Sequence, residues 1–202
     1  MTAEPVLLPS PKANESGVGV DLRADKQWWR WSGKHPVGAL LITAFVATQI
    51  ATTFGYFFPA VGLPTLAWPL SNGTLVAPAT KYGTAASYFA GQFSHYLNGI
   101  AFVLIFAILV HPMLKFGDSS RANLLKAMIF GLIMTLISAG VLVPLVYAPH
   151  TGLGFMSFGH GWKLPAAILL WHIIFVVHIA ALWNPAKVRE VRLEDSAAAT
   201  AA

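Results

Sequence analysis

The residues that could carry chemistry in this chain are its histidines and methionines. The sequence of 202 residues contains no cysteine, which excludes disulfides, thiolate metal sites and cysteine nucleophiles. Seven histidines and five methionines remain as side chains with affinity for a haem or a transition metal. Among them, His95 and His172 lie in two different long apolar runs. An ionisable residue in such a run is a candidate functional residue.

His95 and His172 fit a single b-type haem that is ligated by two histidines. Each lies about seven to nine residues into its run, so at 1.5 Å per residue both are about 10–15 Å deep in the membrane. Equal depth on two helices is what axial ligation from both faces of one haem needs. Gly91 and Gly99 lie one turn on either side of His95 and would leave a groove for the porphyrin. The competing interpretation is close helix packing through small residues, with His95 hydrogen-bonded to a neighbouring helix.

A second candidate site is the segment 148–164, APHTGLGFMSFGHGWKL, which contains His150, Met156 and His160. Imidazole and thioether groups together suit copper. The alternative is a solvated loop that binds no metal, because the spacings of six and four residues are unspecific and the segment is rich in glycine.

Familiar catalytic motifs are missing from the sequence. It contains no GxSxG, HExxH, GxxxxGK[ST] or GxGxxG pattern, and no Asp or Glu lies in an apolar run to act as a buried acid or base. The sequence therefore indicates no autonomous catalysis and leaves open whether the chain takes part in an enzyme.

Four apolar helices must position these residues. Hydrophobic residues make up 56% of the chain, charged residues 10%, and the mean hydropathy is +0.63. A soluble domain carries roughly 25% charged residues, so the chain is expected to be an integral membrane protein, and nucleic-acid binding is disfavoured despite the net charge of +5. Each run reaches the roughly 20 residues that a helix needs to cross a bilayer. The prediction is an all-α membrane protein with a four-transmembrane-helix bundle, its spans at about 37–60, 86–110, 124–147 and 165–184.

The distribution of charged residues predicts the boundaries of the tails and the orientation of the chain in the membrane. Residues 1–27 are predicted to be a disordered cytoplasmic tail, 28–186 the transmembrane domain, and 187–202 a cytoplasmic C-terminal tail. Cations gather before the first span, between the second and third, and after the fourth, whereas the other two loops carry only Lys81 and Lys163. The positive-inside rule then predicts a bacterial inner or plasma membrane protein with both termini in the cytoplasm.

The order of features predicts two tandem helix-hairpin repeats, although chance similarity between apolar helices is the alternative. The first and third spans each run into a Pro/Gly-rich loop, PAVGLP and APHTGLG, and the second and fourth each carry a histidine. With "SHYLNGIAFVLIFAIL" and "WHIIFVVHIAAL", this order resembles an uncharacterised family of small bacterial four-span membrane proteins over residues 36–184. The resemblance implies a four-helix bundle and no established activity.

Three functions from different classes remain open. The first is an accessory or structural subunit of a larger membrane complex, respiratory or oxidoreductase, with other membrane-protein subunits as partners. The second is an electron-transfer subunit that binds one haem b through His95 and His172. The third is a copper-handling protein or small-solute carrier, for which the spans offer little polar lining.

Overall fold

The structure, a computed structural model, describes residues 22–201 of the chain. It is 81% helical and contains no strand in the described part, which confirms the all-α prediction. The elements, in chain order, are α1 (Leu22–Lys34), α2 (Pro36–Phe57), η1 (Phe58–Val61), α3 (Trp68–Val76), η2 (Ala79–Lys81), α4 (Ala85–Ile105), η3 (Phe106–Val110), α5 (His111–Met113), α6 (Ser120–Ile137), η4 (Ser138–Tyr147), η5 (Phe155–Ser157), α7 (Lys163–Leu182) and α8 (Pro185–Thr200).

Four helices in residues 22–201 are long and apolar enough to cross a membrane. They are Pro36–Val61, Ala85–Met113, Ser120–Tyr147 and Lys163–Thr200. The first three match the predicted spans to within a few residues. The fourth includes the polar helix α8, so its apolar part is α7, as predicted.

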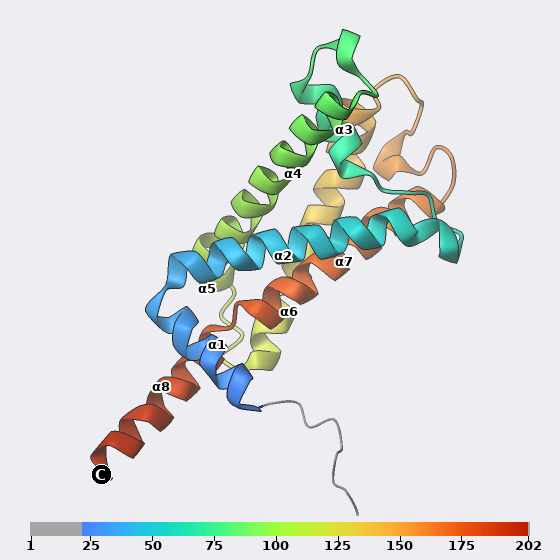
Figure 1. The fold of residues 1–202 in the computed structure, drawn as a ribbon. Helices are drawn as coiled ribbons and strands as arrows, with labels where there is room; N and C mark the ends of the chain where they lie inside the picture. The colour runs from blue at the N-terminus through green and yellow to red at the C-terminus, as the bar shows by residue number, and fades with distance from the viewer. Residues whose placement is uncertain (1–21, 202) are drawn as a thin grey trace, which may run out of the picture.

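The helices form one bundle with two unlike ends (Figure 1). Helix α7 packs against α2 and α6, and α4 packs against α2 and the short helix α3. At one end, α1 and α8 pack together beside the connection between α5 and α6. At the other end lie α3 and the segment that leads from η4 to α7.

Local capping explains where several helices begin. The Oγ1 atom of Thr84 accepts the N–H of Ser87 (3.2 Å) at the start of α4, and Ser119 caps α6 through the N–H of Ala122 (3.1 Å). Pro36 opens α2 at a position where its missing N–H costs nothing.

The second and third spans each contain a π-helical segment in their second half. Five residues of η3 follow α4, and ten residues of η4, including Pro144, follow α6. Widened turns of this kind are rare and often occur at functional sites. Segment η4 is the longer one, and it lines the cavity described below.

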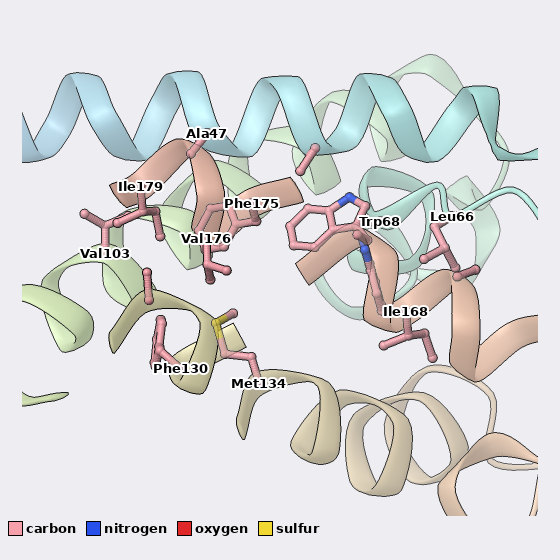
Figure 2. Close-up of a cluster of buried hydrophobic side chains, with 14 of the residues drawn as sticks. Ala47, Leu66, Trp68, Val103, Phe130, Met134, Ile168, Phe175, Val176 and Ile179 are labelled. Atoms are coloured by element: carbon pink, nitrogen blue, oxygen red, sulfur yellow. The ribbon is translucent and has the colours of Figure 1, made fainter. Parts of the chain in front are cut away.

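The core combines a stripe of small residues with large apolar side chains. Ala44, Ala47 and Ala51 are almost completely buried along α2, which lets α7 and α4 approach its backbone. Figure 2 shows the bulky side chains of α4, α6 and α7 that fill the centre of the bundle, with Leu66 and Trp68 reaching it from the segment after α2.

The two tails are helical where the structure describes them. Residues 1–21 of the predicted N-terminal tail lie outside the described residues, but helix α1 already begins at Leu22, before the predicted boundary at residue 27. The predicted C-terminal tail forms helix α8, which Asn184 caps. Its acidic residues pair with the cations of α1, because Lys26 bonds Glu194 (2.7 Å) and Arg30 bonds Asp195 (2.6 Å).

Candidate functional site

A cavity of about 360 Å³ lies inside the bundle between α3, α4, η4 and α7. Its volume is in the range of small-molecule sites. None of its described lining residues is charged. They are Trp68, Asn72, Leu75, Val76, Ser94, His95, Asn98, Gly99, Phe102, Ser138, Leu142, Val146, Tyr147, Trp171, His172 and Phe175. The structure thus brings His95 and His172, on different helices, to the same cavity.

Asn72 on α3 connects the elements around this cavity. Its Nδ2 atom donates to the carbonyl of Trp68 (3.1 Å) and to Nδ1 of His95 (3.4 Å). Its Oδ1 atom accepts from Nδ2 of Asn98 (3.2 Å) and from the hydroxyl of Tyr147 (3.0 Å). A single buried amide therefore joins α3, α4 and η4.

Both ring nitrogens of His95 are hydrogen-bonded. Because Nδ1 accepts from Asn72, Nε2 carries the proton and donates to Oγ1 of Thr52 on α2 (2.9 Å). The Thr52 hydroxyl in turn donates a hydrogen bond to the carbonyl of Thr48 (2.7 Å). His95 is 6% exposed, and these contacts make it a satisfied interhelical histidine.

His172 is held differently, by one short and one long hydrogen bond. Its Nδ1–H donates to the carbonyl of Ile168 (2.8 Å), which leaves Nε2 as an acceptor for the Ser138 hydroxyl at a long 3.3 Å. In each hairpin, therefore, Nε2 of the second-helix histidine meets a hydroxyl on the first span, Thr52 for His95 and Ser138 for His172. This parallel favours the predicted tandem repeat.

The space that the sequence predicted beside Gly91 and Gly99 is filled by protein. A Cβ on Gly91 would lie 2.0 Å from the carbonyl oxygen of Pro69, and one on Gly99 would lie 2.0 Å from Oγ1 of Thr48. Both glycines therefore serve close packing, Gly91 against α3 and Gly99 against α2. The haem hypothesis stays a prediction, and neither the glycine surfaces nor the hydrogen-bonded His95 supports it.

Two tryptophans that line the cavity have indole N–H groups without a hydrogen-bond partner among the described residues. The indole of Trp171 lies beside both imidazole rings, with ring centroids 5.6 Å from His95 and 5.3 Å from His172. It also packs edge-on against Trp68, at 6.0 Å. The Nε1–H groups of Trp68 and Trp171 are buried and have no hydrogen-bond partner within the described residues. Buried polar groups without a partner are rare, and these two belong to residues that line one cavity.

The rim of the cavity is apolar and exposed. Leu75, Val76 and Val146 line the cavity and are 49%, 52% and 41% exposed. They belong to α3 and η4, at the end of the bundle opposite α1 and α8. A ligand can thus keep an apolar part outside while its polar part lies within.

The copper site predicted at His150, Met156 and His160 stays a prediction, and the structure gives these residues the following surroundings. The sulfur of Met156 points at Gly140 of η4, where a Cβ would meet it at 3.0 Å. His150 and His160 are exposed, and Nε2 of His160 donates to the carbonyl of Thr151 (2.7 Å). Among residues 22–201, no three side chains of His, Cys, Asp or Glu gather in a metal-binding cluster.

Sequence reasoning missed Asn72, Tyr147, Trp68 and Trp171. Helix α3, which carries Asn72, could have been recognised from Pro69. Proline is common in the first turn of a helix and therefore marks a helix start inside the predicted loop. Trp171 adjoins His172 in the sequence and could have been paired with it. No sequence pattern pointed to Tyr147.

The fold and the cavity define a class: an all-α bundle with four apolar helices long enough to span a membrane and an internal cavity whose described lining is uncharged. No family model matches the chain, and neither a curated protein nor a solved structure matches it significantly. The family resemblance drawn from the sequence accordingly stays a prediction.

Proposed function

We propose that this protein binds a lipophilic, uncharged molecule whose polar head group carries carbonyl oxygens, as a quinone does. The observation that carries the proposal is the pair of buried indole N–H groups on Trp68 and Trp171, two residues that line one cavity, for which the described residues offer no acceptor. As an accessory subunit of a respiratory or oxidoreductase membrane complex, the role that the sequence favours, the protein would hold such a molecule for a redox partner.

The chemistry of the lining selects the head group. Indole nitrogens only donate hydrogen bonds, so the ligand must supply acceptors. A carbonyl oxygen accepts without carrying a charge, which matches a lining without charged residues. The amide of Asn98 and the hydroxyl of Ser138 adjoin the same space and can adjust to a second oxygen.

The apolar rim of the cavity suits a ligand whose head group carries a hydrocarbon chain. A hydrocarbon chain that leaves past Leu75, Val76 and Val146 would lie along exposed apolar surface and continue into lipid. Entry from the bilayer needs no aqueous path.

The test is a titration of the full-length protein, in lipid nanodiscs, with a decyl-substituted benzoquinone. Nuclear magnetic resonance of ¹⁵N-indole groups reports each tryptophan separately. We expect the resonances of Trp68 and Trp171 to shift downfield and saturate, while that of Trp31, at the far end of the bundle, stays unchanged. Single Trp→Phe variants assign the signals.

The matched control ligand is decylbenzene, which has the chain and ring but no carbonyl group. Equal shifts with decylbenzene and with the quinone would contradict carbonyl recognition. No saturable shift with either ligand would overturn the proposed function as a whole.

We infer in addition that the end of the bundle with α1 and α8 faces the cytoplasm of a bacterial cell. The support is the distribution of cations, because this end holds those of α1, of α8 and of the connection before α6, whereas Lys81 and Lys163 are at the other end.

A further inference from the structure

The side chain of Lys126 is almost completely buried, and no described residue supplies a counterion for it. It lies on α6, six positions after Ser120, so about 9 Å along the helix axis from its start. The residue is only 3% exposed. Within the described residues its ammonium group makes no hydrogen bond and no salt bridge. A buried charge ordinarily has a partner, because removing an ammonium group from water costs free energy that only an opposite charge or good hydrogen bonds offset.

Lys126 lines a separate cavity of about 420 Å³, at the α1–α8 end of the bundle. The other lining residues come from the connection between η3 and α6: His111, Pro112, Leu114, Lys115, Gly117 and Asp118. This cavity shares no residue with the one between Trp68 and Trp171.

The charge in this cavity is positive. Lys115 and Lys126 contribute two cations, and Asp118 one anion. The Asp118 carboxylate already accepts from Nη1 of Arg189 (3.3 Å), and its backbone carbonyl accepts from Nη2 of the same residue (3.0 Å). Asp118 is thus engaged with α8, and the charge of Lys126 is left uncompensated.

We propose that this cavity binds an anionic phosphate group, with Lys126 as its principal partner and Lys115 as a second cation. An ammonium group is a point charge that binds phosphate oxygens well. The neighbouring Met113, Phe116 and Leu125 are exposed apolar residues on which acyl chains can lie. A glycerophospholipid and a free phosphate ion share this chemistry.

The experiment measures the thermal unfolding of the full chain in detergent, with three additives in separate arms: phosphatidylglycerol, phosphatidylcholine and inorganic phosphate. If the site takes a lipid phosphate, phosphatidylglycerol raises the midpoint more than phosphatidylcholine does, and inorganic phosphate has little effect. If it takes a free phosphate ion, inorganic phosphate raises the midpoint in the same concentration-dependent way. A ligand that binds only the folded state stabilises it by mass action, so either rise reports binding.

Variants then assign the effect to Lys126. Lys126→Gln should weaken the stabilising ligand about tenfold or more, since a charge-assisted hydrogen bond is lost, whereas Lys126→Arg should retain binding. Lys81→Met removes a cation from the other end and is the matched control. Native mass spectrometry, which counts retained phosphatidylglycerol molecules per chain, gives a second readout if Lys126→Gln is too unstable to melt cooperatively.

Two results would overturn the proposal. One is an equal rise of the unfolding midpoint in Lys126→Gln and in the unaltered protein when the phospholipids or inorganic phosphate are added. The other is the absence of any stabilisation and of any retained lipid in all three arms. Neither result bears on the quinone titration, which probes the other cavity.

Discussion

At the scale of single residues, Asn72 determines the shape of the candidate site. Its amide uses both donors and its carbonyl oxygen in contacts that reach Trp68, His95, Asn98 and Tyr147. The tautomer of His95 follows from this arrangement, because an imidazole nitrogen that accepts from an amide cannot carry the proton.

Replacing Asn72 with alanine should therefore destabilise the protein by about 1–3 kcal/mol, the cost of leaving buried polar partners unpaired. Unfolding of the purified protein in detergent measures the change. Ser71→Ala, next to it on α3, removes a hydroxyl that makes no contact in this group and should have little effect. Equal effects of the two substitutions would show that the contacts of Asn72 do not matter for stability.

His95 and His172 give a second prediction at the scale of single residues. We expect protein purified from haem-replete cells to show no low-spin haem spectrum, because His95 uses both nitrogens and protein fills the space beside Gly91 and Gly99. Absorption spectroscopy decides the question. A Soret band that disappears in both His95→Ala and His172→Ala, and persists in His111→Ala, would restore the haem hypothesis.

At the scale of elements, hydropathy predicted the four spans well and predicted nothing between them. A run of about 20 apolar residues has few alternatives to a transmembrane helix, which is why the bounds agree to within a few residues. Helix α3 escaped the prediction because Asn72 and Gly73 are poor helix formers and its nine residues are too short to show a period. Its packing against α4, rather than its own sequence, stabilises it.

Segment η4 explains why Tyr147 could not be placed from the sequence. Ser138 and Tyr147 are nine positions apart, and at about 100° per residue in an α-helix they would face opposite sides. In a π-helix, with about 4.4 residues per turn, nine positions make close to two full turns. Both residues then face the cavity, as the structure has them. A prediction from sequence periodicity assumes α-helical geometry, so it places Tyr147 on the side of the helix opposite Ser138.

Close packing of α3 on α4 leads to a prediction for Gly91. Gly91→Ala would place a Cβ 2.0 Å from the carbonyl oxygen of Pro69 and 2.4 Å from the backbone nitrogen of Gly73, so the backbone of α3 must move. We expect a destabilisation of about 1–3 kcal/mol and faster amide hydrogen exchange in α3. In Gly140→Ala the new methyl meets only the flexible end of Met156, at 3.0 Å, and exchange in α3 should stay the same.

At the scale of the whole molecule, contacts between α1 and α8 connect the helix before the first span with the helix that follows α7. Arg30 donates to both carboxylate oxygens of Asp195, with distances from 2.6 to 3.2 Å, and Lys26 reaches Glu194. The hydrogen bond from Arg30 holds the pKa of the Asp195 carboxyl below its ordinary value of 3.8. The residues are exposed, so salt should weaken these pairs.

The sign of the pH effect follows from that lowered pKa. A carboxyl whose pKa is lower in the folded state contributes stability above its ordinary pKa and loses the contribution as the pH falls through the lowered value. Distances between spin labels on α1 and α8 should therefore broaden on acidification below about pH 4, the ordinary range of a carboxyl group. In Asp195→Asn the broad distribution should be present already at neutral pH, and a narrow one there would contradict the role of this pair.

The orientation of the whole molecule is tested by reporter fusions. A fusion after Ala202 to a reporter that is active only in the cytoplasm should be active, and a fusion in the loop that contains Lys81 should be inactive. The reverse pattern would place α1 and α8 outside the cell.

The contact between Asn72 and Tyr147 also constrains the order in which the protein is assembled. Asn72 precedes the second span, and Tyr147 is the last residue of the third, 75 positions later. When only two spans have entered the membrane, the Asn72 oxygen lacks this partner and the cavity lacks the wall that η4 provides. The lining also includes Trp171, His172 and Phe175 of the fourth span, so we expect the site to be complete only after all four spans have been made. A chain that ends after residue 113 should therefore leave α3 more accessible to protease than the full chain does.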